Sequence, residues 1–357
     1  MFNRSQSHHG RPMPSRRSCF VAVLLAVASM ASTTVNAQNF SDYVYTKAGE
    51  ELYGKTRFLP DGVQVNTKGG MKNVRASEIE KFQFAGEPNE LKSGRTLALD
   101  GQYQSALQQL SEINTADLTR AVVQAEHSYL VALCKANLAL IGQVDRTEAI
   151  NLTKKAASQN SKFPHLYDCA RLLGDLAISS GNADAAKRYY GGIARSRDPN
   201  LKIQAAYLMG VAHLMADENE QAGTEFDKVL NLQASNPQVA NLKTLAEAGK
   251  ATVLARTGKA DAALKSIDGL IRQLGEGQSE QGARIYNARG ACYEALNNPD
   301  MALESYLHTH LLYSKQADAH AKALTKLIQL WEKVGKPDLA AKSRSELKQR
   351  YPGFAAS

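Results

Sequence analysis

The sequence predicts a mainly α-helical protein in which helices pair into hairpins and the hairpins stack into an α-α superhelix, preceded by a small five-stranded β module. Two observations support this fold class. A helix–turn–helix pattern recurs along roughly the last three quarters of the 357 residues. Apolar residues alternate between Tyr43 and Phe84, which is the period of β-strands. A polar leader with one short apolar run precedes both regions.

Composition is that of a folded chain. Hydrophobic residues make up 43% and charged residues 22%, so extended disorder is not expected. A repeat array grows along one axis, and its length is therefore not limited by a single core. The net charge is +8, and it falls to +4 if a leader containing Arg4, Arg11, Arg16 and Arg17 is removed. This charge is mild and scattered, so a nucleic acid partner is not expected.

Residues 1–37 have the pattern of a signal peptide. A polar and basic segment is followed by an apolar run, Cys19–Ala31, and small residues at positions 35 and 37 predict cleavage after Ala37. The run is shorter than the about 20 apolar residues of a membrane helix, although an uncleaved anchor is the alternative. No later stretch is long and apolar enough to span a membrane. We therefore expect an exported protein that is periplasmic or extracellular and not inserted in the membrane after cleavage.

Residues 38–86 are predicted to form a separate β module. Turn residues at Pro60-Asp61-Gly62 and at Gly69-Gly70 separate the alternating runs, which indicates two successive hairpins. A brief interruption at Ala76-Ser77-Glu78 precedes the last strand. Five short strands with a turn before the fifth resemble an SH3-like or Sm-like barrel.

The β module is too small to have more than a marginal core, so we expect contacts with the first helix of the array to stabilise it. Tyr43, Tyr45 and Tyr53 are expected to pack the barrel or its junction, with peptide binding as the alternative. Pro88 suits the first turn of a helix, and the helical domain is therefore placed at residues 87–357.

Seven hairpins follow from one recurring small residue. An alanine opens each second helix, at spacings of 36 to 43 residues. In six of the seven, Gly, Asn or Asp stands five residues earlier, where the first helix must end and the chain must turn. A larger side chain four residues later is expected to fill the gap against the next hairpin. The alanines are Ala106, Ala149, Ala186, Ala222, Ala263, Ala302 and Ala340.

This pattern resembles the tetratricopeptide repeat, which has a Leu-Gly pair in its first helix, a Gly-x-Tyr turn, a small residue opening the second helix, an aromatic residue four later and a closing proline. The spacings exceed the family's 34 residues, and the hairpin at Ala149 lacks the turn glycine and the aromatic residue. Another α-α superhelix family is the alternative. The matching positions are Leu173-Gly174, Met209-Gly210, Gly101 with Tyr103, Pro199 and Pro352.

The sequence contains no motif typical of a catalytic or metal-binding site. Cys134, Cys169 and Cys292 lie in apolar helical stretches and are interpreted as small buried side chains. The histidines form no HExxH motif, and the rings of His308 and His310 are about 200° apart on a helix. No metal site, no cofactor and no enzymatic activity are expected.

The tetratricopeptide resemblance implies that the first helix of each pair lines a concave groove that receives a peptide or a partner helix. Side chains of the type Arg, Asn, Gln and Tyr at these positions suit hydrogen bonds to a peptide backbone or a carboxylate. The implied groove residues are Asp168, Arg171, Asp175, Gln204, Tyr207, Arg284, Asn287, Glu294, Lys322 and Gln329.

The resulting functional hypothesis is an exported scaffold that binds another protein or a peptide in this groove. The alternative is a structural or assembly component of the cell envelope that uses the convex face or the β module and has no groove ligand. The heavily charged final helix, 339–350, is expected to be a terminal cap that faces solvent.

Overall fold

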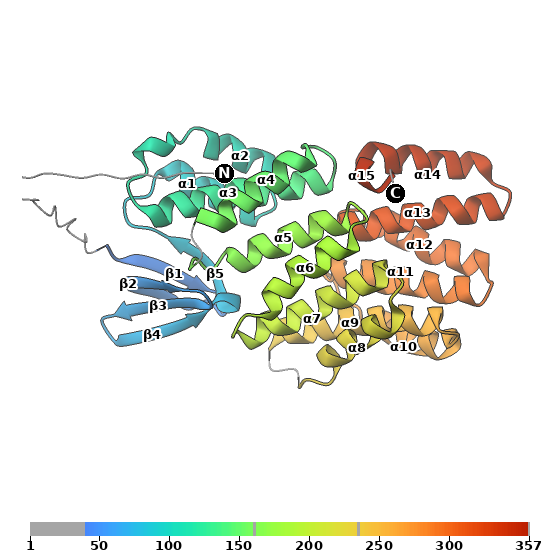
Figure 1. The fold of residues 1–357 in the computed structure, drawn as a ribbon. Coiled ribbons are helices and arrows are strands. Elements are labelled where there is room, and N and C mark those ends of the chain that lie inside the picture. The colour runs from blue at the N-terminus through green and yellow to red at the C-terminus, as the bar shows by residue number, and fades with distance from the viewer. Residues whose placement is uncertain (1–39, 160–161, 234–235, 356–357) are drawn as a thin grey trace, which may run out of the picture. The chain divides into compact units, whose positions relative to one another are not determined.

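The computed structural model describes residues 40–159, 162–233 and 236–355, which form one compact unit (Figure 1). The predicted signal peptide lies outside the described residues. The unit begins with strands β1 (Asp42–Thr46), β2 (Glu51–Leu59), β3 (Gly62–Thr67) and β4 (Gly70–Arg75), the short helix η1 (Ala76–Glu78) and strand β5 (Ile79–Gln83). Helices follow to the end of the described chain.

The five predicted strands are present and form one antiparallel sheet in the order β4-β3-β2-β1-β5. Gly62 and Gly70 stand at the two predicted hairpin turns, and both have positive φ. At Gly62 any side chain is excluded as well, because a Cβ would lie 2.1 Å from the Val74 carbonyl oxygen. The predicted interruption before the last strand is confirmed as η1. The likeness of this sheet to SH3-like or Sm-like barrels stays a prediction.

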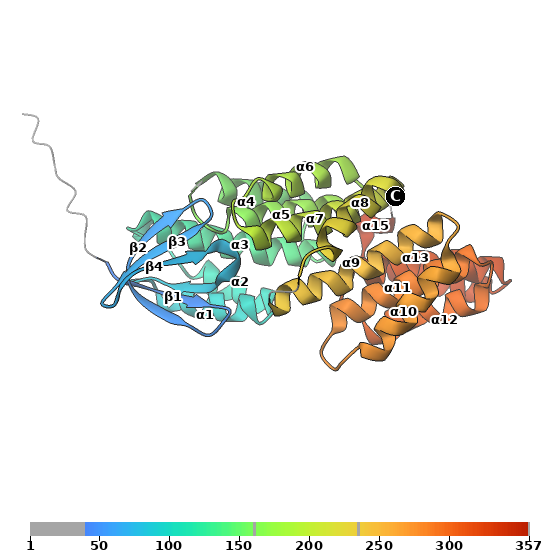
Figure 2. The ribbon, with the colours of Figure 1, turned by 90° about the horizontal axis from the view of Figure 1, so that it is seen from below.

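The helices α1–α14 form seven consecutive antiparallel pairs within the described residues, so the predicted hairpins are confirmed (Figures 1 and 2). Every anchor alanine of the second helices is buried, with at most 1% of its surface exposed. The pairs are α1 (Asn89–Leu99) with α2 (Tyr103–Ser111), α3 (Ala121–Leu140) with α4 (Arg146–Gln159), α5 (Leu166–Ile178) with α6 (Ala183–Ala194), α7 (Pro199–Met215) with α8 (Asn219–Leu230), α9 (Pro237–Arg256) with α10 (Ala260–Gln273), α11 (Ser279–Ala295) with α12 (Pro299–Leu312), and α13 (Ala317–Lys333) with α14 (Pro337–Arg350).

The turn residues perform the predicted role. All six residues that stand five positions before an anchor alanine have positive φ, between 54° and 80°, and each follows the end of a first helix. The hairpin at Ala149 does have a turn glycine, contrary to expectation. Gly142 has φ 73° and stands seven positions before Ala149, because this turn has five residues (141–145) whereas the other hairpins have three or four.

As expected, large residues after the anchors share apolar clusters with the next hairpin, as Tyr190 does with Leu201 of α7. Four of them also lie against a glycine of their own hairpin: Leu110, Tyr190, Phe226 and Tyr306. A Cβ on Gly174 would lie 2.1 Å from the Tyr190 ring, and one on Gly290 would lie 2.6 Å from the Tyr306 ring. Phe226 lies against two glycines, Gly210 of its own hairpin and Gly249 of the next. The glycines therefore let paired helices approach closely enough to bury an aromatic ring between them.

The β sheet is fixed to several helices, and not chiefly to the first one. Arg120, at the start of α3, donates two hydrogen bonds to the buried carboxylate of Asp42 at 2.8 and 2.9 Å. Asp61, in the turn between β2 and β3, accepts hydrogen bonds from the hydroxyls of Tyr167 and Ser196, both at 2.6 Å. Phe163 packs against three phenylalanines of the sheet. The contacts reach from the second hairpin to the start of α7.

The three tyrosines of the module, Tyr43, Tyr45 and Tyr53, lie on the face of the sheet opposite the buried Val44. The rings of Tyr43 and Tyr53 are 4.5 Å apart, and Tyr53 is about half exposed, at 49%. They therefore pack against one another at the surface and do not fill the core of the module.

The C-terminal end of the chain packs against the second hairpin, which the sequence does not reveal. Tyr351 is buried, and Ile141 from the turn between α3 and α4 belongs to the same apolar cluster. A Cβ on Gly142 would lie 2.6 Å from Pro352, the first residue of α15 (Pro352–Ala355). Helix α14 is largely exposed, as a cap should be, but the segment after it joins distant repeats instead of facing solvent.

The three cysteines of the described chain are buried and unpaired, as expected. Burial raises the pKa of each thiol to about 12, so none is ionised at neutral pH. Among the helices of the described ranges, none combines the length and apolar character of a membrane span.

Candidate ligand-binding cavity

A cavity of about 440 Å³ lies along the first helices of the last four hairpins, α7, α9, α11 and α13. These helices contact one another in sequence, α7 with α9, α9 with α11 and α11 with α13. Four of the groove residues implied by the repeat pattern line this cavity together: Tyr207, Arg284, Asn287 and Lys322.

Helical spacing brings these side chains to one surface. Residues three, four and seven apart lie on the same face of a helix. In α7 this face carries Tyr207, Val211 and Leu214, and in α9 it carries Leu245 and Thr252. One side of the cavity is therefore apolar. The ring of Phe226, from α8, adds to it because the glycines at 210 and 249 leave room for the ring.

The other side of the cavity is charged, and most of its charges are paired. Arg256 donates a 2.8 Å hydrogen bond to Asp217, and Arg284 donates to Asp318. Burial alone would raise the pKa of Asp318, but the adjacent Arg284 holds that pKa below its ordinary value. Lys326 pairs at 2.9 Å with Glu294, a carboxylate beside the cavity.

Lys322 differs from these cations because its ammonium group has no hydrogen-bond or ion-pair partner within the described part of the chain. Burial, followed by the positive charges of Arg256, Arg284 and Lys326, lowers its pKa to about 8. The ammonium is still mostly protonated at neutral pH. The cavity therefore holds an excess positive charge that an anionic group could neutralise.

Two polar atoms in the cavity lining are buried without a hydrogen-bond partner among the residues that the structure describes. They are Nε of Arg284, a donor, and Oδ1 of Asn287, an acceptor. The amide nitrogen of Asn287 donates a 2.9 Å hydrogen bond to the Ala319 carbonyl, which fixes the orientation of this side chain. A donor and an acceptor one helical turn apart match the alternating groups of a peptide backbone.

The remaining implied groove residues lie elsewhere on the first helices. Arg171 and Asp175 form an ion pair on α5 at 2.8 Å, and the Tyr190 hydroxyl donates to the same carboxylate. Glu294 and Gln329 line a smaller neighbouring pocket of about 160 Å³. Gln204 is partly exposed on α7 but does not line the large cavity.

Asp168, whose side chain is 44% exposed, lies at the edge of a network of buried charges at the first helices. Arg95 donates to both carboxylate oxygens of Glu87, at 3.0 and 2.7 Å, and to Glu126 at 2.7 Å. The ring of His165 lies 3.2 Å from Glu126 and 2.9 Å from Asp168. Burial opposes charge on the imidazole, but these two carboxylates raise the pKa of His165 to about 9.

Sequence reasoning missed Arg256, Asp318 and Lys326 as cavity residues. Asp318 and Lys326 stand four positions before and after Lys322, so a stripe at helical spacing was visible in the sequence. Arg256 gave no such signal, because it is the last residue of α9 and its role depends on the carboxylate of Asp217 in another hairpin.

Comparison with known proteins identifies the fold. No protein-family model matches the chain, and no curated protein matches it in sequence. It is similar in structure to a tetratricopeptide repeat protein from Parabacteroides merdae, with a TM-score of 0.51, 13% sequence identity and coverage of 75% of this chain and 96% of that one. The apo form of RapI matches with a TM-score of 0.43, 13% identity and coverage of 72% of this chain and 74% of that one.

The likeness to the first of these structures confirms the fold class. The chain has the tetratricopeptide-like helical repeat fold, preceded by a five-stranded antiparallel sheet.

Proposed function

We propose that this chain is an exported interaction scaffold that binds an acidic segment of a partner protein in the cavity along α7, α9, α11 and α13. The observation that carries the proposal is the unpaired ammonium of Lys322 among three other cationic side chains. An acidic side chain or a terminal carboxylate is the simplest group that neutralises this excess charge.

The apolar side of the cavity supports a peptide in preference to a small anion. Tyr207, Val211 and Leu214 offer a surface for one aliphatic or aromatic side chain beside the charged site. The unpartnered atoms of Arg284 and Asn287 supply a donor and an acceptor for the backbone between the two anchors. Export is part of the proposal because of the leader at residues 1–37, and it would place the partner in the cell envelope or outside the cell.

A random peptide library selected on the full chain tests the proposal. Bound peptides should be enriched in Asp and Glu and should contain an aliphatic or aromatic residue nearby. A charge-assisted hydrogen bond contributes about 1.5–3 kcal/mol, so Lys322→Glu should weaken binding of the selected peptides roughly 10- to 100-fold.

Lys265→Glu is the matched control, because it makes the same charge change at an exposed position on α10. Its binding should equal that of the unmodified chain. Peptides without acidic enrichment, or peptides that bind the Lys322→Glu variant unchanged, would contradict the proposal. Binding that is instead lost when Tyr53 is replaced would favour the β module as the contact surface.

A further inference from the structure

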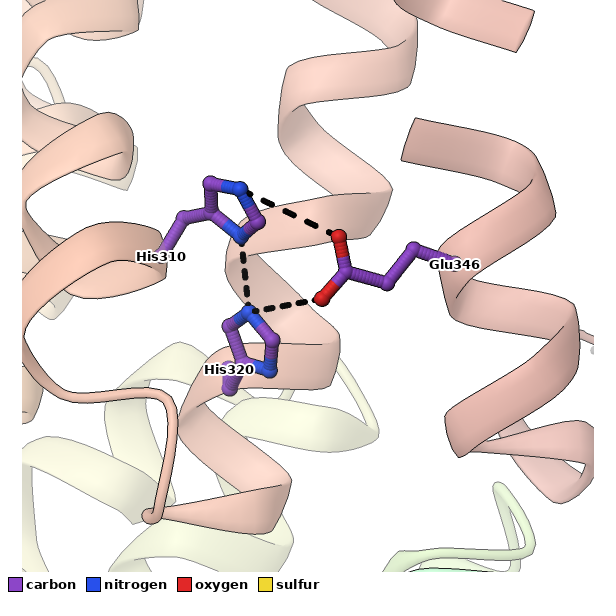
Figure 3. Close-up of side chains that lie close together, drawn as sticks. All are labelled: His310, His320 and Glu346. Carbon is purple, nitrogen blue, oxygen red and sulfur yellow. Dashed lines mark hydrogen bonds and ion pairs between the residues drawn. The ribbon is translucent and has the colours of Figure 1, made fainter. Parts of the chain in front are cut away.

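Three side chains near the C-terminal end of the array converge from three helices (Figure 3). His310 comes from α12, His320 from α13 and Glu346 from α14. Nδ1 of His310 and Nε2 of His320 face one another at 2.8 Å, and the two carboxylate oxygens of Glu346 lie 3.8 Å from His320 and 3.9 Å from His310. One possible ligand atom from each residue lies within 4.8 Å of the others.

A second layer of groups orients the inner histidine. Nδ1 of the fully buried His320 lies 2.8 Å from the Tyr351 hydroxyl, and that hydroxyl lies 3.4 Å from the carbonyl of Ser314, to which it can donate. With the tyrosine donating to Ser314, His320 donates its Nδ1 proton to the tyrosine and has its lone pair on Nε2, which accepts from Nδ1 of His310 when no ion is bound. Metal-bound histidines are commonly held in this way, with the other ring nitrogen donating to a fixed acceptor.

We propose that His310, His320 and Glu346 bind a divalent transition-metal ion, with zinc as the best fit, and that water completes the coordination. Zinc prefers imidazole and carboxylate ligands at about 2.0–2.2 Å in tetrahedral geometry, which places ligand atoms roughly 3.3 Å apart. The observed separations lie on both sides of that value, so small side-chain rotations bring the three ligands to one ion.

One neighbouring group competes with the metal. Arg350 donates a 2.9 Å hydrogen bond to Glu346 and also donates to Ser314. The carboxylate must therefore be shared between the guanidinium and the ion, which favours moderate over very tight binding. A bound ion would tie α14 to α12 and α13, and would stabilise the end of the array that contacts the second hairpin.

Zinc binding by the metal-stripped full chain tests this site. Calorimetric titration with zinc alone should show a site whose affinity falls at least about tenfold in His310→Ala and in Glu346→Gln. Both positions are partly exposed, whereas replacement of the buried His320 would disturb folding directly. Zinc should also raise the unfolding temperature of the unmodified chain but not that of His310→Ala.

His308→Ala is the matched control, because His308 stands two residues away on the same helix and stacks on Tyr286, outside the cluster. This variant should bind zinc as the unmodified chain does. His8 and His9 of the leader are present in every variant, so they contribute equally to all titrations. Equal zinc binding by the unmodified chain and His310→Ala, with both correctly folded, would overturn the proposal.

Discussion

Replacement of Gly174 by alanine should destabilise the protein, although alanine is the better helix former. Gly174 lies within α5, and a Cβ there would be 2.1 Å from Cε1 of Tyr190, far inside van der Waals contact. The Tyr190 ring is 1% exposed, and its hydroxyl donates a 2.8 Å hydrogen bond to Asp175. The ring is therefore held by packing at one end and by the hydrogen bond at the other.

The size and sign of the effect follow from two opposing contributions. Alanine in place of glycine in a helix favours folding by up to about 1 kcal/mol. Overpacking a buried site usually costs about 1–3 kcal/mol, and the rigid contact here places this site at the upper end. We expect a net decrease in the free energy of unfolding of about 1–2 kcal/mol.

Gly191→Ala is the matched control, on the partner helix α6. A Cβ at Gly191 would meet no heavy atom within 4 Å, so this change should stabilise the chain by about 0.5–1 kcal/mol. Urea unfolding followed by far-ultraviolet circular dichroism measures both variants. If Gly174→Ala were stabilised as much as Gly191→Ala, the close packing of tyrosine on glycine within a hairpin would be refuted.

Two further predictions concern ionisable groups. The pKa of His165 is raised from 6.5 to about 9, so its favourable contribution to folding is complete below pH 6.5 and is lost as the pH rises through about 9. The free energy of unfolding should fall across this pH interval by at most about 3 kcal/mol. His165→Gln should remove this pH dependence. The same pH dependence in the variant would show that His165 is not its source. Lys322, with a pKa lowered to about 8, should be acetylated faster at mildly alkaline pH than the exposed Lys265, as measured by mass spectrometry. Bound acidic peptide should protect it, and slow acetylation of Lys322 would show that its amine is not activated.

The hairpins could be predicted from the sequence because their signals are local. Helix period, the small residue at each anchor and a turn residue five positions earlier all lie within one hairpin, and the structure confirms them. The strands of the β module were predictable for the same reason, since alternation and turn glycines are short-range patterns.

Interactions between hairpins could not be predicted in the same way. The packing of Pro352 on Gly142 joins residues more than two hundred positions apart, and no periodicity records it. The pairing of His310 with His320 depends on how α12 crosses α13, and the spacing of His308 and His310 alone argued against any shared ion.

The cavity has some features that the sequence predicts and others that it does not. Tyr207, Arg284, Asn287 and Lys322 could be named from their place in the repeat, because first helices present the same face in each hairpin. The net charge of the cavity could not be predicted from the sequence. It depends on which carboxylates pair with Arg256 and Arg284, and on the absence of a partner for Lys322 in the described ranges.

The central functional claim is that the ligand occupies the cavity on the first helices. Photo-crosslinking tests it most directly, with a benzophenone amino acid placed at Thr325, in the cavity lining of α13, or at Lys265, on the exposed face of α10. Peptides selected on the full chain should crosslink at position 325 and not at position 265. Crosslinking at position 265 alone would contradict the claim and would place the ligand on the second helices.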